Sequence, residues 1–306
     1  MKAGSNLEKV LEKGQFAVTC ECGPPKSASG DVIRQKAKLI KGKVDAANIT
    51  DNQAAIVKLS SFAAATILLK EGIEPVMQVT ARDRNRIAIQ SDLLGASAVG
   101  IRNVLLLTGD HQKLGNHPEA KGVFDLDSIQ MIDMARRMRD ERRFQNGEVM
   151  DVPPKLFIGA AENPLAEPAE YRVPRLEKKV VAGADFIQTQ GVFDVERFEK
   201  WMAAVRAHGL HKKVHIIAGV VPLKSLGTAK FVNDKVLGMT VPDALFERMK
   251  KASDAKAEGV KIAVETIEAL RKIEGVHGVH IMAIEWEEKV AEIVEKAGLL
   301  PRPAPQ

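Results

Sequence analysis

The 306-residue sequence predicts an α/β fold, a single (β/α)8 TIM barrel. Short apolar runs alternate with longer segments of helical periodicity from end to end, which is the order of elements in a chain of βα units. Most of these runs are almost continuously apolar, as is typical of parallel strands buried on both faces. No change in composition divides the chain, and its length suits a barrel of about 250 residues with insertions.

Each predicted strand is followed by a predicted helix. The first strand, 16–22, is rich in β-forming residues and ends at a Gly-Pro-Pro turn. All the strands are predicted at 16–22, 45–50, 74–80, 103–108, 155–161, 186–190, 214–221 and 279–284. The helices are predicted at 31–41, 53–71, 83–98, 127–143, 169–182, 194–208, 225–234 with 242–252, 255–273 and, last, 286–297.

An open, doubly wound sheet is the main alternative to the barrel. That fold usually carries a G-x-G-x-x-G motif after its first strand. No two glycines in this chain are separated by a single residue. The barrel is therefore favoured, as one domain over residues 1–300 followed by a flexible tail, 301–306.

Two segments are longer than a tight turn requires. Residues 109–126 follow the fourth strand, so a barrel would place them on the face that carries the chemistry. Residues 146–154 precede the fifth strand and are predicted to be a connector on the opposite face.

Composition excludes several classes of function. The net charge of +5 is spread over interleaved Lys, Arg, Asp and Glu, and only 4% of residues are aromatic, so we expect no nucleic-acid binding. No apolar run approaches about 18 residues, and the N-terminus lacks the pattern of a signal peptide, so we expect no membrane insertion. Cys20 and Cys22 are too few for a disulfide framework or a metal quartet, which suits a cytoplasmic protein.

Glu21 is the most informative single residue. It ends the first apolar run, where a carboxylate is either paired or has a raised pKa suited to donating a proton. A structural role, bonded to backbone N–H groups or to a lysine, is the alternative. Polar residues also end most other predicted strands, and a barrel would bring them together: Thr50, Gln78, Thr80, Thr108, Asp110, Glu162, Gln190 and Glu285.

The polar strand ends contain no obvious metal site or nucleophile. The seven histidines are scattered, and no His-Glu-x-x-His or paired-cysteine spacing occurs. We expect no metal. Carboxylates, amides and hydroxyls suit acid catalysis in a site where a bound organic cofactor performs the difficult chemical step.

Several motifs together resemble the methylenetetrahydrofolate reductase family, over about residues 6 to 298. They are Val18-Thr-Cys-Glu-Cys-Gly-Pro-Pro-Lys26, Gln78-Val-Thr80, Leu107-Thr-Gly-Asp110, Lys179-Val-Val-Ala-Gly-Ala-Asp-Phe-Ile-Gln-Thr-Gln190 and Phe193-Asp194. Gly278-Val-His-Ile-Met-Ala-Ile-Glu-Trp-Glu-Glu288 and Thr108-Gly-Asp-His-Gln112 are similar to the short reductases of acetogens and related anaerobes.

The resemblance implies a cytoplasmic flavoprotein of one-carbon metabolism that passes a hydride from flavin N5 to 5,10-methylenetetrahydrofolate. Glu21 matches the family's general acid, which protonates N10, and Asp110 matches an acidic residue near flavin and folate. Gln190 matches an amide that contacts the pterin. Flavin-contacting positions are matched by Thr50, Gln78, Thr80, Thr108, Gly109, Asp110, Ala160, Glu162 and Lys179, although Lys179 could equally be an exposed helix lysine.

Departures from the family pattern concern the cofactor and the electron donor. Bulky aromatics are common at Cys22 and Gly23, an arginine at Thr108 and a histidine at Gln78, so both FAD and FMN remain candidates. Leu226, a matched substrate-binding position, replaces an aromatic that stacks on nicotinamide or folate. Electrons could therefore arrive from NAD(P)H or from an electron-delivering or zinc-containing partner subunit.

Two other functions remain open from the sequence. One is a flavin-free folate-binding subunit of a larger complex, and the other is a barrel methyltransferase that uses methyltetrahydrofolate. Homo-oligomerisation, and the choice between methionine biosynthesis and energy metabolism, are also undecided.

Overall fold

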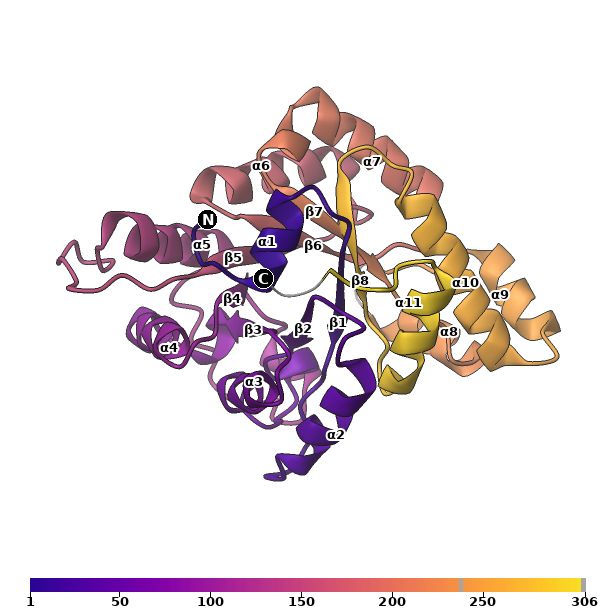
Figure 1. Cartoon of the computed structure of the whole chain (residues 1–306), viewed down its shortest axis with the longest axis horizontal. Helices are drawn as coiled ribbons and strands as arrows, with labels where there is room; N and C mark the ends of the chain where they lie inside the picture. The colour runs from indigo at the N-terminus through magenta and orange to yellow at the C-terminus, as the bar shows by residue number, and fades with distance from the viewer. Residues whose placement is uncertain (237–238, 304–306) are drawn as a thin grey trace.

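A computed structural model describes residues 1–236 and 239–303, and the barrel runs through it from β1 to β8 (Figure 1). All neighbouring strands are parallel, and β8 pairs with β1 to close the sheet in chain order. The predicted (β/α)8 fold is confirmed. The strands are β1 (Ala17–Glu21), β2 (Ala46–Ile49), β3 (Pro75–Thr80), β4 (Asn103–Leu107), β5 (Phe157–Glu162), β6 (Phe186–Gly191), β7 (His215–Val220) and β8 (Val276–Ile281).

Helices surround the barrel in the described part of the chain. They are α1 (Asn6–Glu12), α2 (Asp31–Ile40), α3 (Ser61–Lys70), α4 (Arg86–Ala98), α5 (Ser128–Arg136), α6 (Arg172–Ala182), α7 (Val195–Ala207), α8 (Leu226–Lys235), α9 (Asp243–Lys251), α10 (Ala255–Leu270) and α11 (Val290–Lys296). Short 3-10 turns occur at Gln53–Ala55, Ala81–Asp83, Gln112–Leu114, Ala169–Tyr171, Leu210–Lys212 and Glu287–Lys289, and a π-helical turn at Arg137–Glu141.

The largest differences from the sequence-based expectation occur at the eighth strand, at residues 53–71 and before the first strand. The eighth strand is Val276–Ile281 and not 279–284, because its inward positions are Gly278 and His280, which interrupt the apolar run. The helix expected over 53–71 is a 3-10 turn and a separate helix, α3, with extended chain between them. Helix α1 was not expected, because seven residues are too short to display a clear helical period.

The amino-terminal end of the barrel is filled with apolar side chains. The rings of Phe157 and Phe186 stack inside it, with centroids 5.1 Å apart. Leu7, Val10 and Leu11 of α1 pack against these inward-facing residues and cover this end. Ser5 caps α1, since its hydroxyl accepts the backbone N–H of Glu8. Access to the barrel interior is therefore left to the carboxyl end.

A buried polar layer crosses the middle of the barrel. The Gln188 amide bonds the Asn48 amide at 2.5 and 3.1 Å, and it donates to the Thr19 hydroxyl at 3.1 Å. His280 Nδ1 lies 2.9 Å from the same hydroxyl. Burial lowers the pKa of His280 to about 3, so its ring is neutral. The layer thus presents no charge to the carboxyl end above it.

No helix in residues 1–236 or 239–303 is both long and apolar enough to span a bilayer.

Candidate active site

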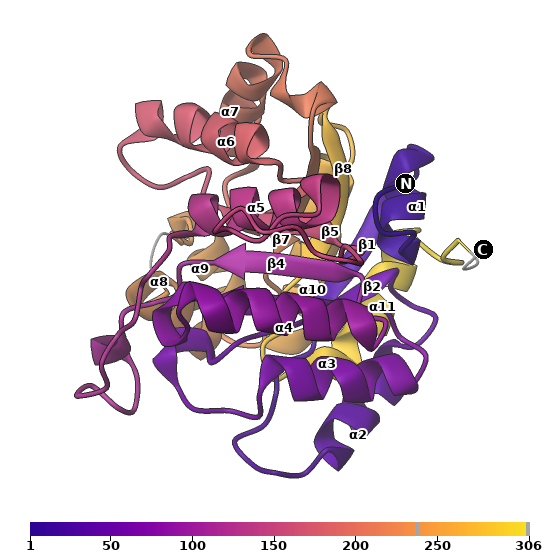
Figure 2. The same cartoon turned by 90° about the vertical axis from the view of Figure 1, so that its left-hand side faces the viewer.

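The polar strand ends meet at one end of the barrel. Because the strands are parallel and the sheet is closed, their carboxyl ends form a single rim. In Figure 2 this rim lies on the side to which the arrowhead of β4 points. The residues predicted for the site lie on the strand ends, on the loops after them, or on α6 and α8: Glu21, Thr50, Gln78, Thr80, Thr108, Gly109, Asp110, Ala160, Glu162, Gln190, Lys179 and Leu226.

Glu21 is the last residue of β1 and pairs in register with Asn48 of β2. It is 9% exposed, and the side-chain amide of Gln53 donates to its Oε1 at 3.5 Å. Burial raises the pKa of Glu21 from 4.5 to about 7, because desolvation disfavours the carboxylate. A carboxyl group with this pKa is partly protonated at neutral pH, which is the state a general acid requires.

Three charged side chains also act on the pKa of Glu21. Lys58 has the largest effect of the three and lowers it, Glu287 raises it, and Lys36 lowers it. Lys36 Nζ bonds the Glu287 carboxylate and donates to the backbone oxygen of Gly23 at 3.0 Å. The Lys36 charge is therefore already partly neutralised by Glu287.

Asp51 holds the ends of β2 and β3 together. Its carboxylate accepts the backbone N–H and the hydroxyl of Thr80, both at 2.9 Å, and it pairs with Arg84 at 2.6 Å. The Thr80 hydroxyl is thus engaged within the protein. Neither Asp51 nor Arg84 was predicted from the sequence to belong to the site. The sequence signal that could have identified Asp51 is its position directly after Thr50, at the end of a predicted strand.

The end of β4 is shaped by a glycine. Gly109 has φ +91°, and a Cβ there would lie 3.2 Å from the side chains of both Thr80 and Arg82. Arg82 is 3% exposed and donates to the backbone oxygen of Asp110 at 3.1 Å. The Asp110 side chain is left exposed at the rim. Arg82 was likewise missed as a residue that orients this loop.

Thr50 and Thr108 differ in how their hydroxyls are used. The Thr108 Oγ1 accepts the backbone N–H of Ser128 at 3.1 Å, at the start of α5. The Thr50 Oγ1 is buried and has no hydrogen-bond partner in the described part of the chain. Buried hydroxyls are normally bonded, so the Thr50 hydroxyl is unusual in being left unsatisfied just after β2.

A family model described as methylenetetrahydrofolate reductase matches residues 6–298. The chain belongs to the methylenetetrahydrofolate reductase family. The resemblance carried by the motifs around Glu21 and Asp110 is confirmed.

Two relatives named as reductases of this family are 24% and 29% identical to the chain over the residues that align. "Methylenetetrahydrofolate reductase 2" of Schizosaccharomyces pombe is 29% identical over 260 residues, which are 79% of this chain and 38% of that protein. "5,10-methylenetetrahydrofolate reductase" of Salmonella typhimurium is 24% identical over 236 residues, 76% of this chain and 73% of that protein. The chain thus spans well under half of the fungal relative's length.

Solved structures share the fold of this reductase-family chain. An uncharacterized protein from Clostridium thermocellum that binds two copies of 5-methyl-5,6,7,8-tetrahydrofolic acid has a TM-score of 0.70 at 15% identity, covering 96% of this chain and 98% of that one. Oxaloacetate acetylhydrolase has a TM-score of 0.52 at 13% identity, covering 91% and 80%. At such identities the likeness shows the barrel alone.

Some of the positions matched to the reductase family do not face the rim. Ala160 follows the inward-facing Gly159 and packs in the layer between the barrel and its helices. Lys179 Nζ bonds Glu162 at 2.6 Å and the backbone oxygen of Ala161 at 2.5 Å, and both charged side chains are at most 4% exposed. These residues join β5 to α6.

Gln190 lies near the end of β6, and Leu226 follows β7. Gln190 is half-buried beside a register shift in β6, and its backbone oxygen accepts the Thr189 hydroxyl at 2.8 Å. Leu226 begins α8 and packs into an apolar cluster that includes Val221 and Met282. The position expected to contact substrate is thus part of an apolar wall.

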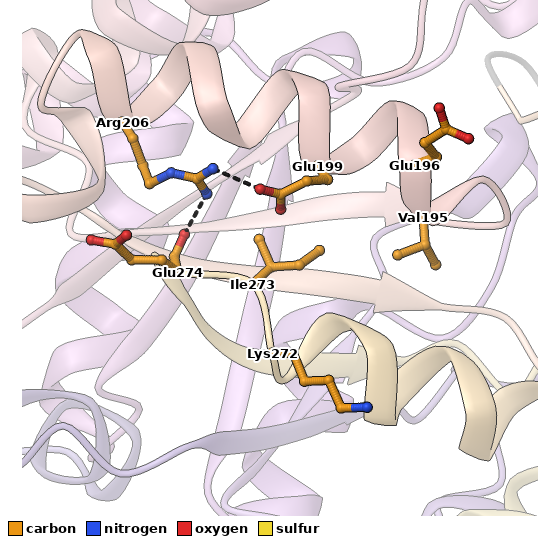
Figure 3. Close-up of a pocket in the computed structure, with 7 residues that line it drawn as sticks. All are labelled: Val195, Glu196, Glu199, Arg206, Lys272, Ile273 and Glu274. Carbon is orange, nitrogen blue, oxygen red and sulfur yellow. Dashed lines mark hydrogen bonds and ion pairs between the residues drawn. The ribbon is translucent and has the colours of Figure 1, made fainter.

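A separate hollow lies outside the barrel (Figure 3). It has a volume of about 550 Å³ and is lined by Val195, Glu196, Glu199, Arg206, Lys272, Ile273 and Glu274. Arg206 bonds Glu199 at 2.6 Å and the backbone oxygen of Glu274 at 2.9 Å across it. None of the lining residues belongs to the strand ends, so the catalytic candidates are elsewhere.

Within residues 1–236 and 239–303, no group of three or more His, Cys, Asp or Glu side chains could hold a metal ion.

Proposed function

We propose that this protein reduces 5,10-methylenetetrahydrofolate to 5-methyltetrahydrofolate. The observation that carries the proposal is Glu21, a buried carboxyl group at the rim of the barrel with a pKa of about 7. Membership of the reductase family and the position of Asp110 on the same rim support it. The reaction is that of an oxidoreductase acting on a CH–NH group.

Glu21 supplies the proton that the reaction needs. The five-membered ring of the folate must open before a hydride can reach its methylene carbon, and opening requires a proton on N10. A carboxyl group matched in pKa to neutral pH is both protonated and acidic enough to provide it. The proton passes from Glu21 to N10, and Glu21 is left as a carboxylate.

Asp110 is proposed to act through its charge. Ring opening leaves a cationic iminium at N5 of the folate. The Asp110 carboxylate stands on a loop whose backbone is held by Arg82, and a fixed negative charge there would stabilise that cation. Gln190 and Leu226 would contact the substrate from the β6 and β7 side of the rim.

The residues at the rim fit a flavin, FAD or FMN. The buried Thr50 hydroxyl, without a partner among the described residues, would gain one from the cofactor. The flavin supplies the hydride when it is bound, and NAD(P)H or a partner subunit would reduce it. The holding residues are proposed to be Thr50, Gln78, Thr80, Thr108, Gly109, Asp110, Ala160, Glu162 and Lys179.

Two of these holding residues are already bonded to each other. A flavin phosphate at Lys179 would have to replace Glu162 or the Ala161 oxygen as the partner of its ammonium. The contribution of Ala160 would come from its backbone, because its side chain faces the helices.

The Glu21→Gln variant tests the proposal. It should lower methylenetetrahydrofolate reduction by about 10²–10⁴-fold, because general acid catalysis is removed. Reduction of the bound flavin by its electron donor should be unchanged, since that step needs no proton on N10. Rapid-mixing absorbance of the flavin measures both half-reactions, and Glu268→Gln, an exposed glutamate on α10, is the control.

Three outcomes would count against the proposal. Folate reduction that survives in Glu21→Gln would remove Glu21 as the acid. A colourless protein that takes up neither added FAD nor added FMN would favour a flavin-free folate-binding subunit. Methyl transfer from methyltetrahydrofolate to a corrinoid protein, without flavin, would favour the methyltransferase.

A further inference from the structure

The two oxygens of the Glu21 carboxyl group have different surroundings. Oε1 accepts a hydrogen bond from the side-chain amide of Gln53, at 3.5 Å. Within residues 1–236 and 239–303, no other side chain bonds this carboxyl group, and Oε2 has no partner. Glu21 is nevertheless only 9% exposed at the rim. Gln53 is therefore the side chain through which the described part of the chain holds Glu21.

This difference between the oxygens decides where the proton of the acid lies. A protonated carboxyl group carries its proton on one oxygen and accepts hydrogen bonds with the other. Since Oε1 of Glu21 faces an N–H donor, the proton belongs on Oε2. The separation of 3.5 Å is longer than the usual N–H···O distance of about 2.9–3.0 Å, as hydrogen bonds of catalytic groups often are before substrate is bound.

The backbone around Gln53 is strained. Asn52 before it, and Ala54 and Ala55 after it, all have positive φ, at 43°, 55° and 56°. Left-handed conformations of non-glycine residues cost of order 1–3 kcal/mol and persist where the surroundings enforce them, often at functional sites. The strained turn brackets Gln53, so its neighbours in the fold must keep it in place.

Hydrogen bonds fasten the loop between β2 and α3, to which Gln53 belongs. The backbone N–H of Lys58 donates to the side-chain oxygen of Asn52 at 3.0 Å, which closes the loop on itself. The backbone N–H of Leu59 donates to the oxygen of Pro25 at 2.9 Å, in the loop that follows β1. The loop that carries Gln53 is thus tied to the loop directly after Glu21.

A second loop, the long segment after β4, packs against the first. A Cβ at Gly115 would lie 1.8 Å from the Ala55 oxygen. Gly115 has φ −101°, which any residue can adopt, so only its missing side chain lets the two loops meet. The Val57 N–H also donates to the side chain of Asn116 at 3.2 Å. The segment after β4 therefore helps to set the position of Gln53.

We infer that Gln53 is a positioning residue for the acid: its amide holds Oε1 of Glu21, so that the proton on Oε2 is presented to the substrate. The role rests on the proposed function, in which Glu21 is the acid. The Oε2–H bond of Glu21 breaks, the N–H bond at N10 of the folate forms, and the electron pair of the broken bond stays on Glu21 as a carboxylate. Gln53 keeps its own protons and donates to the group before and after the transfer.

Infrared spectra of the full-length protein test the contact directly. Difference spectra against Glu21→Gln, at a pH below the Glu21 pKa of about 7, isolate the C=O band of the protonated carboxyl group. In Gln53→Met, whose side chain has a similar length and no amide, this band should move to higher wavenumber because Oε1 loses its hydrogen bond. Gln35→Met, at an exposed glutamine of α2, should leave the band in place.

Folate reduction gives a second readout. In Gln53→Met, kcat for 5,10-methylenetetrahydrofolate should fall by about tenfold, the effect of one hydrogen bond, with KM little changed. Reduction of the flavin by its electron donor should be unchanged, because that step takes no proton from Glu21. A role of Gln53 in folding alone would lower both half-reactions. Gln53→Leu is a second variant without the amide, should Gln53→Met fail to fold.

Gly115→Ala tests the support from the second loop. The added methyl group must push this loop away from Ala55, while the Gln53 and Glu21 side chains keep their chemistry. The C=O band and kcat should change in the same direction as in Gln53→Met. Gly95→Ala is the control, because a Cβ at Gly95 meets only the Phe62 ring, at 3.4 Å.

The outcomes separate the role of Gln53 from the proposed function. An unchanged C=O band in folded Gln53→Met or Gln53→Leu overturns the role, whatever the activity. A shifted band with an unchanged kcat also overturns it, because the contact would then have no effect on proton transfer. A shifted band in a protein that does not reduce 5,10-methylenetetrahydrofolate supports the hold of Gln53 on Glu21 and rejects the proposed reaction. An unchanged band in folded Gly115→Ala overturns the part assigned to the second loop.

Discussion

Burial raises the pKa of the Glu21 carboxyl group, and it also makes the stability of the folded protein depend on pH. The carboxyl group is 9% exposed, and desolvation raises its pKa from 4.5 to about 7. The native protein therefore binds this proton more tightly than the unfolded chain does. The resulting stabilisation is complete below about pH 4.5 and is lost as pH rises through about 7.

Glu21→Gln should consequently change the pH dependence of stability. Relative to the variant, the wild-type free energy of unfolding should fall by up to roughly 3 kcal/mol between about pH 5 and about pH 8, as the raised pKa requires. Urea unfolding at the two pH values measures the difference. Equal changes in both proteins would mean that Glu21 titrates with an ordinary pKa.

At the scale of residues, the local pattern singled out Glu21 as a buried carboxyl group and missed its neighbours. Glu21 could be found because it ends an apolar run beside a double proline. Gln53 could not, because its hydrogen bond to Glu21 depends on a loop whose turn is enforced by tertiary contacts. Lys179 was ambiguous for the same reason, since its partner Glu162 lies on another element.

Between elements, the Lys179–Glu162 pair joins helix α6 to strand β5. Both side chains are at most 4% exposed, and burial lowers the pKa of Lys179 while Glu162 opposes that shift. An ion pair in such surroundings is costly to break from one side, because the remaining charge stays buried. Its contribution is to keep α6 in register with the barrel wall.

Lys179→Met should therefore destabilise the protein by about 3–5 kcal/mol, and adding Glu162→Gln should recover part of the loss. Denaturant unfolding of the single and double variants measures the coupling. Lys200→Met provides the control, because its pair with Glu196 is exposed on α7 and should contribute nothing measurable. A small effect of Lys179→Met would show that the Glu162 charge finds another partner or a proton.

Most elements could be predicted because helices and parallel strands differ in the period and length of their apolar residues. The expectation failed where that pattern is interrupted. The eighth strand was predicted at 279–284 and not at Val276–Ile281 because Gly278 and His280 interrupt its apolar pattern. Both point into the barrel, where the glycine fits against Ala17 and the histidine joins the polar layer. The division of 53–71 depends on the turn at Ala54 and Ala55, which no helical period encodes.

For the molecule as a whole, closure of the amino-terminal end joins distant parts of the chain. Arg302 bonds Asp45, just before β2, at 2.6 Å and donates to the Phe16 oxygen, just before β1, at 2.8 Å. Lys2 pairs with Asp185, just before β6, at 2.5 Å. The flexible tail expected at 301–306 remains a prediction: Arg302 is bound, and 304–306 lie outside the described residues.

Arg302→Met should destabilise the protein by about 3 kcal/mol, because it leaves the buried Asp45 carboxylate without its cation. Hydrogen exchange should accelerate at the starts of β1 and β2, and mass spectrometry of the corresponding peptides measures it. Arg34→Met, which breaks an exposed pair with Asp31, should leave exchange there unchanged. Unchanged exchange in Arg302→Met would mean that Arg302 does not fasten the barrel.

The closed amino-terminal end of the barrel also determines where labels and supports can be attached without covering the rim. Residues 1–3 and 301–303 both lie at the end covered by α1, on the far side of the polar layer from Glu21. A fluorophore or a tether to a solid support attached beside Lys2 or Arg302 would stand away from the open rim. Anchored in this way, the molecule would present the open rim outward, where a small molecule could reach it.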